Sequence, residues 1–258
     1  MATSNVEVED SAWKGFYRIG GVAALIATVL FLSDIVVLIT LGPLPSTAND
    51  WFTLLQNNRV IGIFQLFFTD LIGMVLMIPI IFALYAALRR ASGVYSALAM
   101  ALAFIGIAII FATNTNYSMI YLSDQYAAAT TEIQRAQLLT AGESTLATGT
   151  WGTGPLVAGL LVESALVILS VIMLQDRTHA FGKGTAYLGI LAHGLDVAHS
   201  IVFLVFIPIF NLDLALTIGT ALLAIGGTLQ LIWYPLVARR LLQLGRQERK
   251  MPALATQA

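Results

Sequence analysis

The chain has 258 residues, of which 58% are hydrophobic and only 10% are charged, and its formal net charge is −1. Soluble domains carry roughly 25% charged residues, so this composition excludes an ordinary soluble protein. The small net charge gives no reason to expect nucleic acid as a partner. The sequence contains no cysteine, which excludes a disulfide framework, a thiolate metal site and a cysteine nucleophile. We therefore expect an all-α, polytopic membrane protein whose main partner is the lipid bilayer.

Six apolar stretches are each about as long as the 20 or so residues that a membrane-spanning helix needs. They cover residues 17–41, 60–88, 94–122, 156–174, 184–210 and 214–237. Together they predict a bundle of six transmembrane helices over residues 17–238, between an N-terminal tail at 1–16 and a basic C-terminal tail at 239–258. Residues 1–11 are polar and acidic, with Glu7, Glu9 and Asp10, unlike the basic start of a cleavable signal, so we expect them to be retained and poorly ordered.

Two polar stretches are predicted to lie outside the membrane. Residues 46–58 are too polar to cross it, but their apolar side chains indicate a short helix that rests on the membrane surface. Those side chains are Trp51, Phe52, Leu54 and Leu55. Residues 124–143 have the alanine, glutamine and leucine content of an exposed helix.

The basic residues fall almost entirely on one side of the six-span arrangement. That side holds Lys14, Arg18, Arg89, Arg90, Arg177, Lys183, Arg239, Arg240, Arg246, Arg249 and Lys250, and the other side holds Arg59 and Arg135. Basic residues concentrate in cytoplasmic loops, so we expect both termini to be cytoplasmic.

Two histidines and an aspartate interrupt the fifth predicted span, in the segment GILAHGLDVAHS at residues 189–200. The spacing places Asp196 three residues from both His193 and His199, so the carboxylate lies between the two imidazoles on one flank of the helix. A charged aspartate at mid-bilayer costs about 2.5–3.5 kcal/mol, so such a residue usually faces a partner or a polar cavity. We therefore expect this flank to belong to a binding site.

Three further acidic residues lie inside predicted spans. Asp70 and Glu163 are at a depth similar to that of Asp196, and Asp34 lies somewhat further out. These acids converge in one cavity only if the first, second, fourth and fifth spans are neighbours. The alternative is a purely structural role, in which each acid is protonated and only fixes the packing of the helices.

These residues support three functional hypotheses. The leading one is a proton- or cation-linked carrier, since each half of three spans has acids in its first two helices, as in inverted-repeat transporters. The second is a metal-dependent membrane enzyme acting on a lipid or other apolar substrate, with a divalent metal on His193, His199 and Asp196. The third is a non-catalytic membrane subunit or sensor. Of the three hypotheses, only the metal-dependent enzyme requires a cofactor, a divalent metal. The ligand is a small ion or an apolar molecule. The sequence does not decide whether the chain forms a homo-oligomer.

Two cofactor classes are disfavoured by the positions of lysine and histidine. A retinal Schiff base needs a lysine within a span, and Lys14, Lys183 and Lys250 all lie outside the predicted spans. A haem held between two helices is disfavoured because both intramembrane histidines lie on the same helix.

Three segments carry a resemblance to a known family. They are YRIGG at residues 17–21, FGKGTAYLGI at 181–190 and WYPLVARRL at 233–241. In these segments, and loosely over most of its length, the chain resembles the bacterial membrane family called domain of unknown function 4386. The resemblance implies a multi-pass protein of the bacterial cytoplasmic (inner) membrane without an assigned activity. The histidines and aspartate of the fifth span are not explained by it.

Overall fold

The computed structural model describes residues 2–42, 44–67, 71–149, 152–206, 209 and 212–246. Within these ranges every regular element is a helix, so the predicted all-α fold class is confirmed. The helices are α1 (Ala2–Leu41), α2 (Ala48–Asn57), α3 (Arg59–Phe67), α4 (Gly73–Leu88), α5 (Gly93–Thr113), α6 (Asn116–Ala128), α7 (Glu132–Gly149), α8 (Thr153–Gln175), α9 (Lys183–Ile201), the π-helical turn η2 (Val202–Phe206) and α11 (Leu212–Arg246).

Five helical stretches are long and apolar enough to cross a membrane. They are Trp13–Val37, Gly93–Ala128, Glu132–Gln175, Lys183–Val205 and Asp213–Arg246. The apolar helix α4 has 16 residues and is therefore about 24 Å long, shorter than the roughly 30 Å of a bilayer core. The helices thus indicate a multi-pass membrane protein, and the sixth span stays a prediction.

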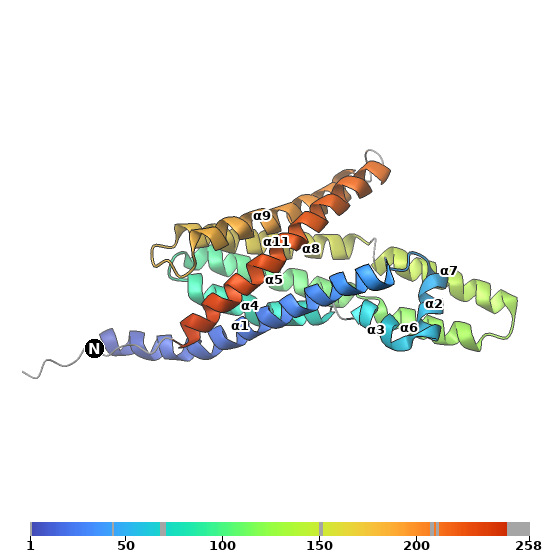
Figure 1. Cartoon of the computed structure of the whole chain (residues 1–258), viewed down its shortest axis with the longest axis horizontal. Coiled ribbons are helices and arrows are strands. Elements are labelled where there is room, and N and C mark those ends of the chain that lie inside the picture. The colour runs from blue at the N-terminus through green and yellow to red at the C-terminus, as the bar shows by residue number, and fades with distance from the viewer. Residues whose placement is uncertain are drawn as a thin grey trace, which may run out of the picture.

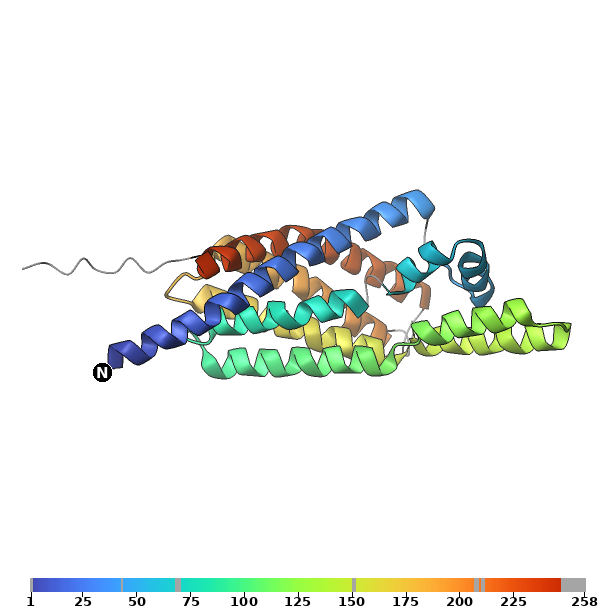
Figure 2. The ribbon, with the colours of Figure 1, turned by 90° about the horizontal axis from the view of Figure 1, so that it is seen from below.

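Figures 1 and 2 show α1, α4, α5, α8, α9 and α11 side by side in one bundle. The most extensive contacts join α5 to α8, α8 to α9, α9 to α11, α11 to α1 and α1 to α4. The start of α1 and the end of α11 lie at the same end of this bundle. A hydrogen bond ties them together, because Arg18 Nε donates to the carbonyl oxygen of Gly245 at 3.0 Å.

Helix α1 directs its small residues inward and its large apolar residues outward. Ala23, Ala24 and Ala27 are buried, while Val29 and Ile39 are 64% and 77% exposed. Small residues let helices approach closely in lipid, and large apolar side chains gain nothing by leaving a hydrocarbon surrounding. This distribution is the one expected of a helix that faces lipid on its outer side.

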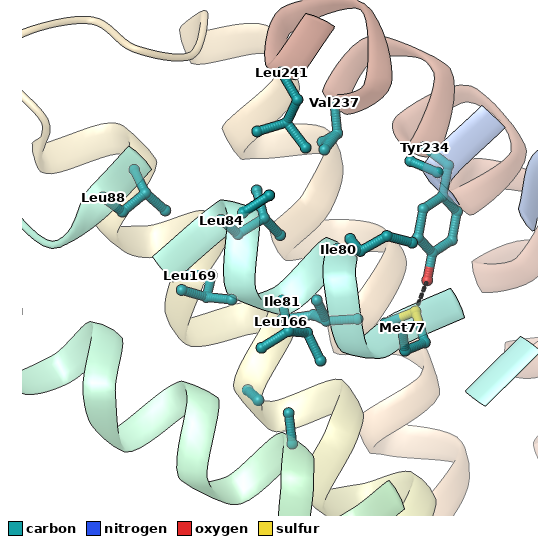
Figure 3. Packing of buried hydrophobic residues seen from close by; sticks show 14 of the residues in the cluster. Met77, Ile80, Ile81, Leu84, Leu88, Leu166, Leu169, Tyr234, Val237 and Leu241 are labelled. Atoms are coloured by element: carbon teal, nitrogen blue, oxygen red, sulfur yellow. Dashed lines mark hydrogen bonds between the residues drawn. The ribbon is translucent and has the colours of Figure 1, made fainter. Parts of the chain in front are cut away.

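The short helix α4 lies in the core of the bundle. Its Ile80, Ile81, Leu84 and Leu88 are fully buried. Figure 3 shows them packed among side chains of α8 and α11. The core residues from these two helices are Leu166, Leu169, Val237 and Leu241. Helix α4 therefore holds the other helices together although it is short.

The helices α2, α3, α6 and α7 lie at the end of the bundle opposite the start of α1 (Figures 1 and 2). The predicted helix at residues 46–58 is present as α2, and the Thr47 side chain caps it by accepting a hydrogen bond from the backbone N–H of Asp50. Its apolar face is not free for the membrane surface as predicted, because Trp51, Phe52 and Leu55 are buried against other helices of this end. Protein contacts thus replace the expected lipid contacts.

Several helix boundaries differ from the prediction, and two of them have a local cause in the sequence. Helix α1 begins at Ala2, so residues 2–11, expected to be poorly ordered, belong to a helix. The reason is that no glycine or proline interrupts the chain before Gly15. The predicted span 94–122 breaks after Thr113, because the Asn114 side chain accepts a hydrogen bond from the backbone of Asn116 and competes with the helix.

Candidate functional site

A cavity of about 420 Å³ lies between α1, α4, α8, α9 and α11. Three of the predicted acids line it, namely Asp34 from α1, Glu163 from α8 and Asp196 from α9. The other lining residues are Ala27, Leu30, Phe31, Gly73, Met74, Met77, Val162, Leu223, Gly227, Gln230 and Tyr234. The structure therefore brings acids from the first, fourth and fifth predicted spans to one place. The predicted Asp70 lies outside the described residues.

Glu163 connects the cavity to a buried histidine. The Nδ1 atom of His193 lies 2.7 Å from Oε2 of Glu163. The His193 side chain is completely buried, whereas that of Glu163 is 18% exposed. The two residues meet because α8 and α9 pack along their lengths. An imidazole and a carboxylate at this distance can share or exchange a proton, so this pair is suited to moving protons to and from the cavity.

Asp196 is held by a residue that the sequence analysis did not single out. Nε2 of Gln230 on α11 donates a hydrogen bond of 2.5 Å to Oδ2 of Asp196. Both residues are more than nine-tenths buried. The other carboxylate oxygen, Oδ1, has no hydrogen-bond partner among the described residues. The signal that could have found Gln230 is that it is a lone amide in an otherwise apolar span.

His199 does not join the other predicted site residues. Its Nδ1 donates to the carbonyl oxygen of Gly219 at 2.9 Å, and its ring packs 4.6 Å from the ring of Phe203. Among the residues that the structure describes, no three histidine, aspartate or glutamate side chains lie close enough to hold a metal ion. His193, His199 and Asp196 therefore do not form the three-ligand set that the metal hypothesis requires.

The cavity wall also contains two aromatic rings, which differ in chemical character from the acids. The rings of Phe31 on α1 and Tyr234 on α11 have their centroids 5.6 Å apart. The Tyr234 hydroxyl donates to the sulfur of Met77 at 3.4 Å (Figure 3), which fixes the ring at the edge of the hydrophobic core. No lysine or arginine is among the described residues of the wall. The cavity thus combines aromatic and carboxylate groups and favours a cation over an anion.

Behind His193, polar atoms of three helices are buried without partners. His193 Nε2, Ser170 Oγ and Trp233 Nε1 make no hydrogen bond within the described part of the chain. The ring of Trp233 lies edge-on to that of His193, with centroids 4.5 Å apart. At Gly189 a Cβ atom would lie 2.3 Å from Ser170 Oγ and 2.4 Å from Trp233 Nε1. Only glycine fits at this position, because α8, α9 and α11 come close together there. The sequence analysis did not identify Gly189 as a contact between these helices.

No protein-family model, curated protein or solved structure matches the chain. The resemblance to domain of unknown function 4386 therefore remains a prediction from the sequence.

Proposed function

We propose that the protein is a small carrier of the bacterial cytoplasmic membrane that binds protons or other cations in this cavity. The observation that carries the proposal is that Asp34, Glu163 and Asp196 come from three different helices and line one cavity. A charged carboxylate within a bilayer costs about 2.5–3.5 kcal/mol, so three at one site are expected to serve binding. Packing alone could be provided by apolar residues at no such cost.

Each carboxylate has a distinct role in the proposed carrier. Glu163 exchanges a proton with His193, which lies behind it and is not itself a residue of the cavity wall. Asp196 is held in position by Gln230 and attracts the cation with the charge of its carboxylate. Asp34 provides a third negative group from α1. Binding of a cation and release of a proton are thereby coupled, because the carboxylates interact across the same cavity.

The proposal includes six spans and cytoplasmic termini. Support comes from the basic residues, which gather at the end of the bundle where α1 starts. There Arg89 stacks 4.7 Å over the ring of Trp13, and Arg240 donates to the carbonyl oxygen of His179 at 3.3 Å. At the opposite end Arg59 is neutralised by an ion pair with Asp124 at 2.6 Å. This asymmetry favours the basic end as the cytoplasmic one.

The experiment uses the purified full chain in liposomes that contain a pH-sensitive dye. Gradients of protons, sodium or potassium are imposed, and the change of internal pH is followed. We expect flux above that of empty liposomes for the wild type and its loss in Asp196→Asn. The control Asp50→Asn changes an exposed acid on α2 outside the cavity and should leave the flux intact. If no gradient drives flux through the wild type, the carrier is wrong and a non-catalytic subunit or sensor takes its place.

A further inference from the structure

We infer that the cargo of the cavity is a lipophilic organic cation, a compact apolar molecule that bears one substituted ammonium group. The inference rests on the carrier function proposed above and names the class of ligand for the same site. It is drawn from the size of the cavity, from the chemistry of its wall and from an unpartnered carboxylate oxygen.

The cavity is larger than an inorganic cation needs. Its volume of about 420 Å³ falls within the roughly 300–1,000 Å³ of pockets that bind small organic molecules. A bare metal ion would need several ligands drawn tightly around it, and the described residues offer no such cluster. The space therefore fits a molecule with an apolar body.

The wall has two kinds of surface that such a molecule would match. Most of it is apolar, with Ala27, Leu30, Met74, Met77, Val162 and Leu223. Phe31 and Tyr234 add two neighbouring aromatic rings. An ammonium group with alkyl substituents is attracted to aromatic faces, and this attraction grows when the group is removed from water. The methionine side chains adapt to ligands of irregular shape.

The acids provide the charge that selects a cation. Asp196 is more than nine-tenths buried and lines the cavity, yet its Oδ1 has no hydrogen-bond partner in the described part of the chain. A buried carboxylate with a single hydrogen bond, here the one from Gln230, is only partly compensated, so a cation in the cavity would stabilise it. A substituted ammonium is less strongly hydrated than a sodium ion and therefore loses less on entering an apolar cavity.

One glycine makes it possible to fill the cavity without touching the acids. Gly227 on α11 lines the cavity, and a Cβ atom there would meet no other atom within 4 Å. A leucine at this position would occupy the space of the ligand. Gly194 on α9 also has no atom within 4 Å of a Cβ, and it is not among the residues of the wall. The pair Gly227→Leu and Gly194→Leu is therefore a matched test and control.

The probe is radiolabelled benzyltrimethylammonium, measured by equilibrium dialysis with the purified full chain in detergent. The positive charge of the probe does not change with pH, so any change of binding with pH comes from the protein alone. We expect saturable binding that is weakened at least about tenfold in Asp196→Asn and lost in Gly227→Leu. Gly194→Leu and Asp50→Asn should bind like the wild type. The neutral isostere neopentylbenzene should not displace the probe.

The outcomes separate this inference from the carrier proposal. If the wild type conducts protons in liposomes but does not bind the probe, the organic cargo is wrong and the carrier stands. If sodium displaces the probe at equal concentration, or if neopentylbenzene does, the ligand class is likewise wrong. If the wild type neither binds the probe nor conducts any imposed ion, both proposals fail.

Discussion

Glu163 Oε2 and His193 Nδ1 lie 2.7 Å apart, and of the two residues only Glu163 lines the cavity. Among the described residues, Glu163 is the wall residue that lies within hydrogen-bond distance of the buried imidazole. This contact gives a proton a direct route between the cavity and His193.

Replacing Glu163 should separate hydrogen bonding from charge. Glu163→Gln keeps a hydrogen-bond partner for His193 and should leave the midpoint of unfolding almost unchanged while it reduces pH-dependent flux. Glu163→Leu leaves His193 Nδ1 buried without a partner and should lower the free energy of unfolding by about 0.5–2 kcal/mol. The measurement is unfolding of the purified protein in mixed micelles. Equal stability of the Leu and Gln variants would mean that the contact is not made.

Gly189 should not tolerate any side chain. In Gly189→Ala the new methyl group would lie 2.3 Å from Ser170 Oγ and 2.4 Å from Trp233 Nε1. Overpacking of this kind costs about 1–3 kcal/mol. The control Gly194→Ala, on the same helix with open space around it, should be neutral or slightly stabilising. A thermal melt of both variants in detergent compares them, and equal melting temperatures would contradict the close contact of α8, α9 and α11.

The proposed topology can be tested by labelling single cysteines, because the chain has none of its own. Ala91 and Arg177 are exposed at the basic end of the bundle, and Thr140 is exposed on α7 at the other end. In whole cells, a membrane-impermeant thiol reagent should label Thr140→Cys and should not label Ala91→Cys or Arg177→Cys until the membrane is opened. Labelling of Ala91→Cys and Thr140→Cys from the same side would contradict the arrangement.

Asp176, in the loop between α8 and α9, should make the stability pH-dependent. Burial of its carboxylate raises its pKa, but hydrogen bonds from Thr178 and the backbone N–H of Ala180, with the nearby charge of His179, outweigh burial and hold the pKa below its ordinary value of 3.8. A lowered pKa stabilises the fold above pH 3.8, and this contribution is lost as the pH falls through the folded-state pKa.

The variant Asp176→Asn should therefore melt at a lower temperature than the wild type near neutral pH. The difference should shrink as the pH falls below about 4, because the wild-type carboxylate then becomes protonated. Asp50→Asn, at an exposed position, should show no such pH-dependent difference. A difference for Asp176→Asn that stays constant from neutral to acidic pH would contradict the assigned role of the charge.

The helices and the acids of the site could be predicted from the sequence because each has a strong local signal. Long apolar stretches predict helices, since an exposed backbone is too costly in lipid. Asp34, Glu163 and Asp196 stand out because charged residues are rare in such stretches. That they line one cavity depends on which helices pack together, and no local pattern in a single sequence contains that information.

The features that the sequence did not reveal depend on contacts between distant segments. The face of α2 with Trp51 and Phe52 looks like a membrane-surface helix, but the chain folds α6 and α7 over it. Gln230 became a site residue only because α11 packs beside α9. His199, which shares a flank with Asp196 in the sequence pattern, bonds to the backbone of α11 instead. Helical spacing gives the direction of a side chain and not the neighbour that it meets.

In the proposed carrier, Asp196 binds and releases a proton or a cation at the cavity. Infrared difference spectra of the purified chain test it most directly, because they resolve the carbonyl stretch of protonated carboxyl groups. We expect this band to weaken when the pH is raised or benzyltrimethylammonium is added, and we expect the part that belongs to Asp196 to be missing in Asp196→Asn. Identical difference spectra for the wild type and a folded Asp196→Asn would contradict the claim.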